Sequence, residues 1–205
     1  MNITDVLRAL LFGSVFTSLI ILIEIIKRKS LLTSEITRRI DHLMAGCYAI
    51  ICYYYLPFAL FIFLFLSFLI VISYSHYKNI FTSVHQVRRQ TYGAMLFPLA
   101  VIIIFLISQI NAHIFLPSIL IITIADSLAG IASDIEKKSH KTRAGFIVFF
   151  ITTLIILSIT LPNLPWSVSI IVSIILAIVE RLSKYGTDNI TVPIASAILL
   201  LLLQV

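Results

Sequence analysis

The sequence has little charge and few residues that interrupt helices. Only 12% of its 205 residues are charged and 60% are hydrophobic, with six glycines and six prolines. This composition is too apolar for a soluble domain and is typical of an integral membrane protein. Cys47 and Cys52 lack the spacing of a metal or redox motif, so we interpret them as packing residues. The composition therefore predicts a single integral membrane domain over residues 1–205.

Several common binding motifs are missing as well. The sequence contains no GxxxxGK[ST], no GxGxxG and no kinase catalytic loop, which excludes the usual soluble ATP sites. The five histidines form no metal-ligand pattern. No nucleic-acid fold signature accompanies the net charge of +6, so the basic residues point to phosphates and membrane lipid headgroups and not to nucleic acid.

Long hydrophobic runs fill most of the chain. A window of about 20 apolar residues, the length that spans a bilayer, detects eight segments. They lie near residues 5–26, 42–56, 57–75, 94–110, 112–132, 145–161, 165–181 and 190–204. The second and third are divided only at Pro57, where we expect a tight turn. We therefore predict an all-α membrane bundle of about eight transmembrane helices.

The basic residues gather in alternate loops. All Lys and Arg residues other than Arg8 fall in or beside the loops 27–42, 76–93, 133–144 and 182–189. With eight helices these loops share one side of the membrane. The positive-inside rule then makes that side cytoplasmic and places both termini outside.

Asp126 is the most informative single residue. It stands within an apolar run over residues 114–132, where a carboxylate is costly unless it faces protein, water or a cation. It therefore marks a candidate functional site, although a hydrogen bond to a neighbouring helix would also explain it. Small polar residues at helical spacing predict a stripe on the same helix face. These residues are Thr123, Ser127, Gly130 and Ser133.

Other polar residues lie near helix ends on the same predicted side. Lys141 and Arg143 precede Gly145 at the start of the sixth helix, where cations and backbone N–H groups can hold an anion. Asp188 and Asn189 precede the last helix and offer the oxygen donors that Mg²⁺ prefers. Both residue types also favour turns and helix caps.

Glu180 lies near the inner end of the seventh predicted helix. We predict that it supports the site or pairs with Lys184, four residues further on.

The order of these segments resembles the family of CTP-dependent lipid-alcohol kinases, which includes dolichol kinase, phytol kinase and the CTP-dependent diacylglycerol kinase. The resemblance covers most of residues 34–193. Its segments are SEITRRIDH at 34–42, RQTYG at 89–93, DSLAG at 126–130, KTRAG at 141–145 and DNITVP at 188–193.

The resemblance implies phosphoryl transfer from CTP, with Mg²⁺, to a lipid alcohol such as a polyprenol, phytol or diacylglycerol. It implies that Asp126 and Lys141 are catalytic and that Asp126, Asp188 and Asn189 bind the metal. We predict further residues that bind the nucleotide and its phosphates, and a group of residues that supports the site. The nucleotide group is Arg38, Arg39, His42, Arg89, Lys141, Thr142, Arg143 and Gly145, and the supporting group is Glu180, Ser127 and Gly130.

Two alternatives stay open. One is a phosphatidate cytidylyltransferase like CDP-diacylglycerol synthase, whose carboxy-terminal signature, dense in Gly and Asp, is not present at residues 185–189. The other is a non-catalytic lipid-binding or transport protein, because Ala125, Ser133, Ala144 and Phe146 differ from the kinase pattern. The lipid alcohol and the oligomeric state are left open by the sequence.

Overall fold

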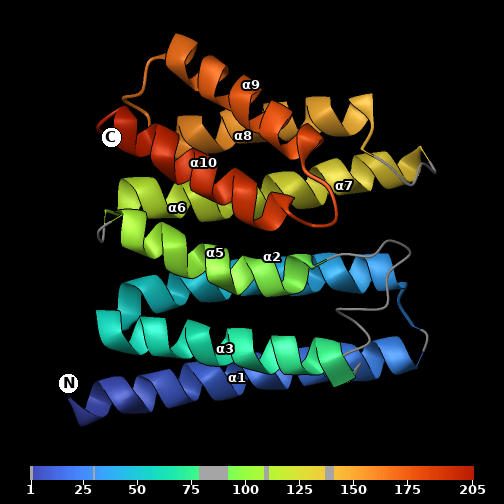
Figure 1. Cartoon of the computed structure of the whole chain (residues 1–205), viewed down its shortest axis with the longest axis vertical. Helices are drawn as coiled ribbons and strands as arrows, with labels where there is room; N and C mark the ends of the chain where they lie inside the picture. The colour runs from blue at the N-terminus through green and yellow to red at the C-terminus, as the bar shows by residue number, and fades with distance from the viewer. Residues whose placement is uncertain (1, 30, 79–91, 109–110, 137–140) are drawn as a thin grey trace. The chain divides into compact units, whose positions relative to one another are not determined.

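The computed structural model describes residues 2–29, 31–78, 92–108, 111–136 and 141–205. Regular secondary structure in these ranges is helical, which confirms the predicted all-α class (Figure 1). The chain divides into two compact units, unit 1 (Met1–Ile102) and unit 2 (Ile103–Val205).

Unit 1 is built from three long helices and the first part of a fourth. These are α1 (Ile3–Arg28), α2 (Ser34–Tyr55), α3 (Phe58–Lys78) and α5 (Gly93–Ser108), within which the unit boundary falls. Helix α1 packs against both α2 and α3. Aromatic residues fill its core: Phe16 stacks on Tyr48 with ring centroids 4.2 Å apart, and Tyr48 also contacts Phe65.

The division between α2 and α3 falls where the sequence predicted it. Helix α2 ends at Tyr55, and Leu56 adopts an extended conformation with φ −112° and ψ 140°. Pro57 disfavours a helical conformation in the residue before it, and α3 begins directly after it at Phe58. The predicted turn at Pro57 is therefore confirmed.

The start of α2 differs from the prediction. The sequence placed a loop over residues 27–42, but α2 already begins at Ser34. The side chain of Thr33 accepts a hydrogen bond from the Ile36 N–H and thereby caps the helix. Consequently His42 lies inside a helix and not at its start.

Unit 2 is organised around one continuous helical stretch. The stretch is formed by α6 (Ala112–Leu120), the π-helical segment η1 (Ile121–Ala125) and α7 (Asp126–Ile135). It is contacted by α8 (Arg143–Thr160) and α10 (Asp188–Leu202), while α9 (Trp166–Leu182) packs on α8 and α10. The central stretch is accordingly more buried than α8. In its most apolar 18 residues 61% are buried, against 28% in α8.

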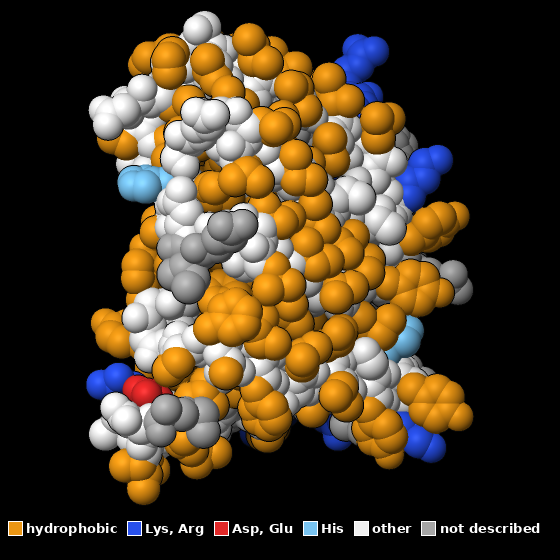
Figure 2. Space-filling model, turned by 60° about the vertical axis from the view of Figure 1, so that its left-hand side comes forward, with side chains coloured by type: hydrophobic (Ala, Val, Ile, Leu, Met, Phe, Trp, Pro, Cys, Tyr) orange, Lys and Arg blue, Asp and Glu red, His pale blue; other side chains and the backbone are white. Residues whose placement is uncertain are grey.

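Four helical stretches among the described residues are long and apolar enough to cross a membrane. They are Ile3–Arg28, Phe58–Lys78, Ala112–Ile135 and Arg143–Thr160. Helices α5 and α10 are apolar but shorter, with 16 and 15 residues. Hydrophobic side chains cover most of the face shown in Figure 2, and Lys and Arg side chains lie at its margins. An exposed apolar surface of this extent fits contact with lipid.

Candidate functional site

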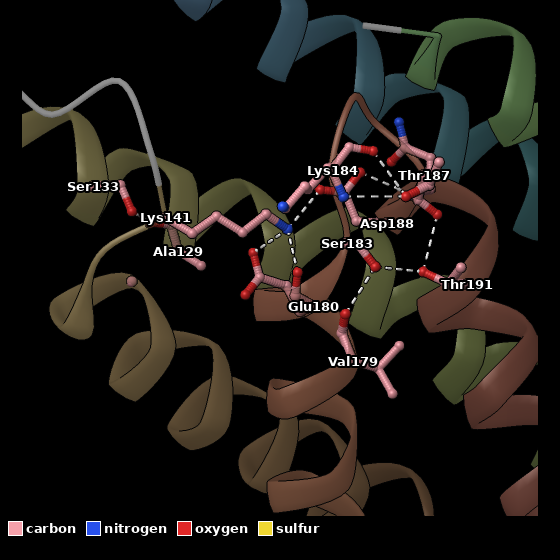
Figure 3. A network of polar contacts seen from close by, with 12 residues as sticks. Ala129, Ser133, Lys141, Val179, Glu180, Ser183, Lys184, Thr187, Asp188 and Thr191 are labelled. Carbon is pink, nitrogen blue, oxygen red and sulfur yellow. Dashed lines mark hydrogen bonds and ion pairs between the residues drawn. The ribbon is translucent and has the colours of Figure 1, made fainter.

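Four ionisable side chains converge in unit 2. Asp126 begins α7, Glu180 lies in the last turn of α9, and Asp188 begins α10; one carboxylate oxygen from each lies within 4.8 Å of the other two. Lys141, from the segment before α8, points its side chain toward Glu180 and Asp188 (Figure 3). We call these four residues the carboxylate centre.

The ammonium group of Lys141 is fully engaged in this centre. Its Nζ lies 2.7 Å from Glu180 Oε1 and 2.7 Å from Asp188 Oδ2. It also donates a hydrogen bond to the backbone carbonyl of Glu180. A lysine ammonium has three N–H donors, so these three acceptors use all of them.

The carboxylates of the centre keep Lys141 in its charged form. Burial acts to lower the pKa of Lys141, but the neighbouring carboxylates of Asp188, Glu180 and Asp126 outweigh it and hold that pKa above its ordinary value. Lys141 is therefore charged at neutral pH. Among the residues that the structure describes, Lys141 forms ion pairs with Glu180 and Asp188. Three carboxylates this close repel one another, and a bound cation or proton lowers that repulsion.

The backbone before Asp126 is a π-helix. The N–H of Asp126 donates to the carbonyl of Ile121, five residues earlier. Within this wide turn the Thr123 hydroxyl donates to the Ile119 carbonyl at 2.7 Å. Such a turn holds one extra residue and redirects the side chains that follow, and it is frequent at functional sites. The predicted polar stripe assumed a regular helix, and the π-helical turn between Thr123 and Asp126 departs from that assumption.

A tight turn sets the last turn of α9 beside the first turn of α10. Tyr185 and Gly186 adopt left-handed conformations, with φ 54° and φ 80°, and glycine does so without a steric penalty. The hydroxyls of Ser183 and Thr191 lie 2.7 Å apart across the two helix ends. The turn thus brings the carboxylates of Glu180 and Asp188 together, although eight residues separate them.

The cap of α8 holds Lys141 in place. The hydroxyl of Thr142 accepts a hydrogen bond from the Gly145 N–H at 3.0 Å and lies 3.2 Å from the hydroxyl of Ser133 on α7. A Cβ atom at Gly145 would come within 2.9 Å of the Ala129 carbonyl oxygen and would also meet Ser133. Glycine therefore permits the close approach of α7 and α8. In this structure Thr142 caps α8, and Gly145 donates the N–H that the Thr142 hydroxyl accepts.

The remaining predicted residues of unit 2 differ in how far they are buried. Asn189 is 5% exposed, and its Oδ1 has no hydrogen-bond partner among the described residues. Ser127 is buried directly after Asp126, Gly130 is partly exposed one turn later, and Arg143 is exposed at the first position of α8.

The donor set fits a divalent cation of the Mg²⁺ type. Mg²⁺ binds oxygen at about 2.1 Å in an octahedron, so that opposite ligand oxygens lie about 4.2 Å apart. The three carboxylate oxygens lie within 4.8 Å of one another, which is close to that separation. The buried Oδ1 of Asn189 finds no hydrogen-bond donor among the described residues, and a buried oxygen in that state is costly unless a ligand satisfies it.

The predicted nucleotide-binding residues of the first half belong to unit 1. Arg38 and Arg39 lie on α2, where Arg38 is 3.7 Å from Glu35 and Arg39 is buried. The ring of His42, also on α2, lies edge-on to Phe97 with centroids 4.9 Å apart. Arg89 falls outside the residues that the structure describes.

Glu180 is more central than the sequence indicated. It was predicted as a supporting residue, and the structure makes it one of three clustered carboxylates and pairs it with Lys141. A signal was present in the spacing of Ser169, Ser173 and Ala177, which places small residues and Glu180 on one face of α9. All three small residues are buried, as is Glu180.

No family model, curated protein or solved structure matches the chain. The carboxylate centre and the sequence motifs are therefore the features that bear on function.

Proposed function

We propose that the protein is a membrane-embedded kinase that transfers the γ-phosphoryl group of CTP, with Mg²⁺, to the hydroxyl of a lipid alcohol. The substrate class includes polyprenols, phytol and diacylglycerol. The observation that carries the proposal is the convergence of Asp126, Lys141, Glu180 and Asp188 from four separate segments. Three of these four residues belong to the segments that resemble the lipid-alcohol kinases.

The centre offers what phosphoryl transfer requires, which is positioning and charge neutralisation. The hydroxyl oxygen of the lipid attacks the γ-phosphorus, the bond from that phosphorus to the β–γ bridging oxygen breaks, and CDP leaves. Asp126 accepts the hydroxyl proton, and Lys141 binds a phosphate oxygen. Asp188, Asn189 and a neighbouring carboxylate would hold Mg²⁺, which would supply charge neutralisation on the phosphates.

The proposed topology places this chemistry at the cytoplasmic face. The four long apolar stretches cross the bilayer, and α2, α5, α9 and α10 complete eight crossings. Both termini are then outside, and the basic loops face the cytoplasm, where CTP is available. The lipid alcohol enters from the bilayer between helices and reaches Asp126, which is only partly exposed.

A turnover assay tests the proposal. Purified protein in detergent is given labelled CTP, Mg²⁺ and a panel of lipid alcohols together with phosphatidate. We expect CDP and a new lipid phosphate from the wild type, and a loss of about 100-fold or more in Asp126→Asn. Asp134→Asn, on the same helix and outside the carboxylate centre, is the matched control and should retain activity.

The products separate the alternatives. Pyrophosphate with a CDP-lipid would replace the kinase by a cytidylyltransferase. Absence of turnover with every acceptor would reject both enzymes in favour of a non-catalytic lipid-binding or transport protein.

A further inference from the structure

Lys141 and a divalent cation would compete for the same oxygens. The ammonium bonds Glu180 Oε1 and Asp188 Oδ2, each at 2.7 Å, and both residues belong to the three carboxylates that can hold a metal. We propose that Lys141 is a displaceable internal cation, which closes the carboxylate centre until a divalent cation takes its place. The inference rests on the proposed function and deepens it by stating how the metal enters.

The burial of the three side chains favours exchange over simple opening. Glu180 and Asp188 are 6% and 15% exposed, while Lys141 is 22% exposed at the edge of the centre. Departure of the ammonium alone would leave buried carboxylates without a cation, which is strongly unfavourable. The ammonium therefore leaves when another cation arrives.

The position of Lys141 in the chain permits this movement. It precedes the helix α8, which is anchored to α7 through the bonds of Thr142. Its side chain has four rotatable bonds, so the ammonium can swing away while the helix stays in place. The backbone at the start of α8 thus stays fixed while the charged end of the Lys141 side chain moves.

The same exchange couples the metal to an anion. While Lys141 donates to Glu180 and Asp188, it has no N–H left for a phosphate oxygen. A divalent cation that occupies the carboxylates frees all three donors. The Lys141 ammonium therefore binds a polyphosphate only after the metal has displaced this ammonium from the carboxylates.

Binding of Mn²⁺ without nucleotide tests the exchange. The free Mn²⁺ signal in electron paramagnetic resonance gives the affinity of the purified full-length protein in detergent. We expect Lys141→Met to bind Mn²⁺ about tenfold more tightly or better, because the competing charge is removed. Lys184→Met removes the same charge from an exposed lysine in the α9–α10 turn and should bind like the wild type.

Two further variants test whether loss of the Lys141 charge is the cause of tighter Mn²⁺ binding. Lys141→Arg keeps a cation and should bind Mn²⁺ as weakly as the wild type, and the double variant Lys141→Met/Asp188→Asn should lose the gain. Because Lys141→Met can be less stable, the rise in melting temperature on adding Mn²⁺ is measured as well, and it should exceed that of the wild type.

The failure of this inference differs from the failure of the kinase proposal. Unchanged or weaker Mn²⁺ binding by Lys141→Met would overturn the exchange, whatever the turnover assay gives. Tighter binding without phosphoryl transfer would support the exchange and reject the kinase.

Discussion

The two units use ion pairs differently. In unit 1 three ion pairs lie within one helix and join residues three or four apart, namely Arg8–Asp5, Arg28–Glu24 and Arg38–Glu35. In unit 2, Lys141 joins Glu180 and Asp188, which are 39 and 47 residues away. Local pairs add little to helix stability, whereas a buried pair between separate segments is costly to break. The unit 2 charges are thus gathered at one place, as binding or catalysis requires.

The largest expected contrast comes from removing one cation in each unit. Lys141→Met leaves three carboxylates without their ammonium, so we expect the free energy of unfolding to fall by about 3–5 kcal/mol. Arg8→Met removes the mostly exposed partner of Asp5 at the start of α1, and there we expect a loss of at most about 1 kcal/mol. Denaturant unfolding in detergent without divalent cations, followed by circular dichroism, measures both.

A pH series checks the cause of the larger loss. The pKa of Lys141 lies above its ordinary value of 10.5, so its contribution is fully present below pH 10.5 and disappears as the pH rises through the higher folded-state pKa. The difference between wild type and Lys141→Met should therefore narrow as the pH rises above 10.5. Equal losses for the two variants would remove the contrast between the units.

The next contrast concerns two helical glycines. A Cβ at Gly145 meets backbone of α7 at 2.9 Å, but a Cβ at Gly13 on α1 meets only Leu64 Cδ1 at 3.5 Å. We expect Gly145→Ala to lose about 1–3 kcal/mol through overpacking. Gly13→Ala should be neutral or gain up to about 1 kcal/mol from helix propensity. Melting curves of the two variants provide the comparison.

A double variant isolates the backbone contact. Ser133→Ala removes the side-chain oxygen that the new Cβ would meet but leaves the Ala129 carbonyl in place. Gly145→Ala/Ser133→Ala should therefore recover only part of the loss. Full recovery of stability would show that the Ser133 side chain, and not the Ala129 carbonyl, limits how closely α7 and α8 approach.

Much of the fold follows from apolar run lengths and proline. Each segment predicted to span the membrane is helical over most of its described residues, and the break at Pro57 falls between α2 and α3. The start of α2 at Ser34 was not predicted, because its charged first turns carry no hydropathy signal and the Thr33 cap is a single side-chain hydrogen bond. Hydropathy therefore locates the helices better than their ends.

The site was predictable in its chemistry and less so in its geometry. Asp126 was selected as a carboxylate within an apolar run, and Lys141 and Asp188 as polar residues near helix ends; the structure brings the three together. The π-helical η1 was not foreseen, because a single wide turn does not change the apolar composition of the run. The pairing of Glu180 with Lys141 depends on how α8, α9 and α10 pack, which periodicity along one helix does not encode.

The smallest contrast compares the two threonine caps. Thr142 is buried and bonds both the Gly145 N–H and Ser133, at 3.0 Å and 3.2 Å, whereas Thr33 is exposed and accepts one bond at 3.4 Å. We expect Thr142→Ala to lower the free energy of unfolding by about 1–2 kcal/mol and Thr33→Ala by less than about 0.5 kcal/mol. Denaturant unfolding measures both.

Serine substitutions show whether the hydroxyl carries this difference. Thr142→Ser keeps the oxygen that caps α8, so it should recover most of the stability that Thr142→Ala loses. Thr33→Ser should differ little from Thr33→Ala, since the exposed cap of α2 competes with water. If Thr142→Ser were as unstable as Thr142→Ala, packing of the methyl group would be responsible, and the cap would no longer explain how Lys141 is held.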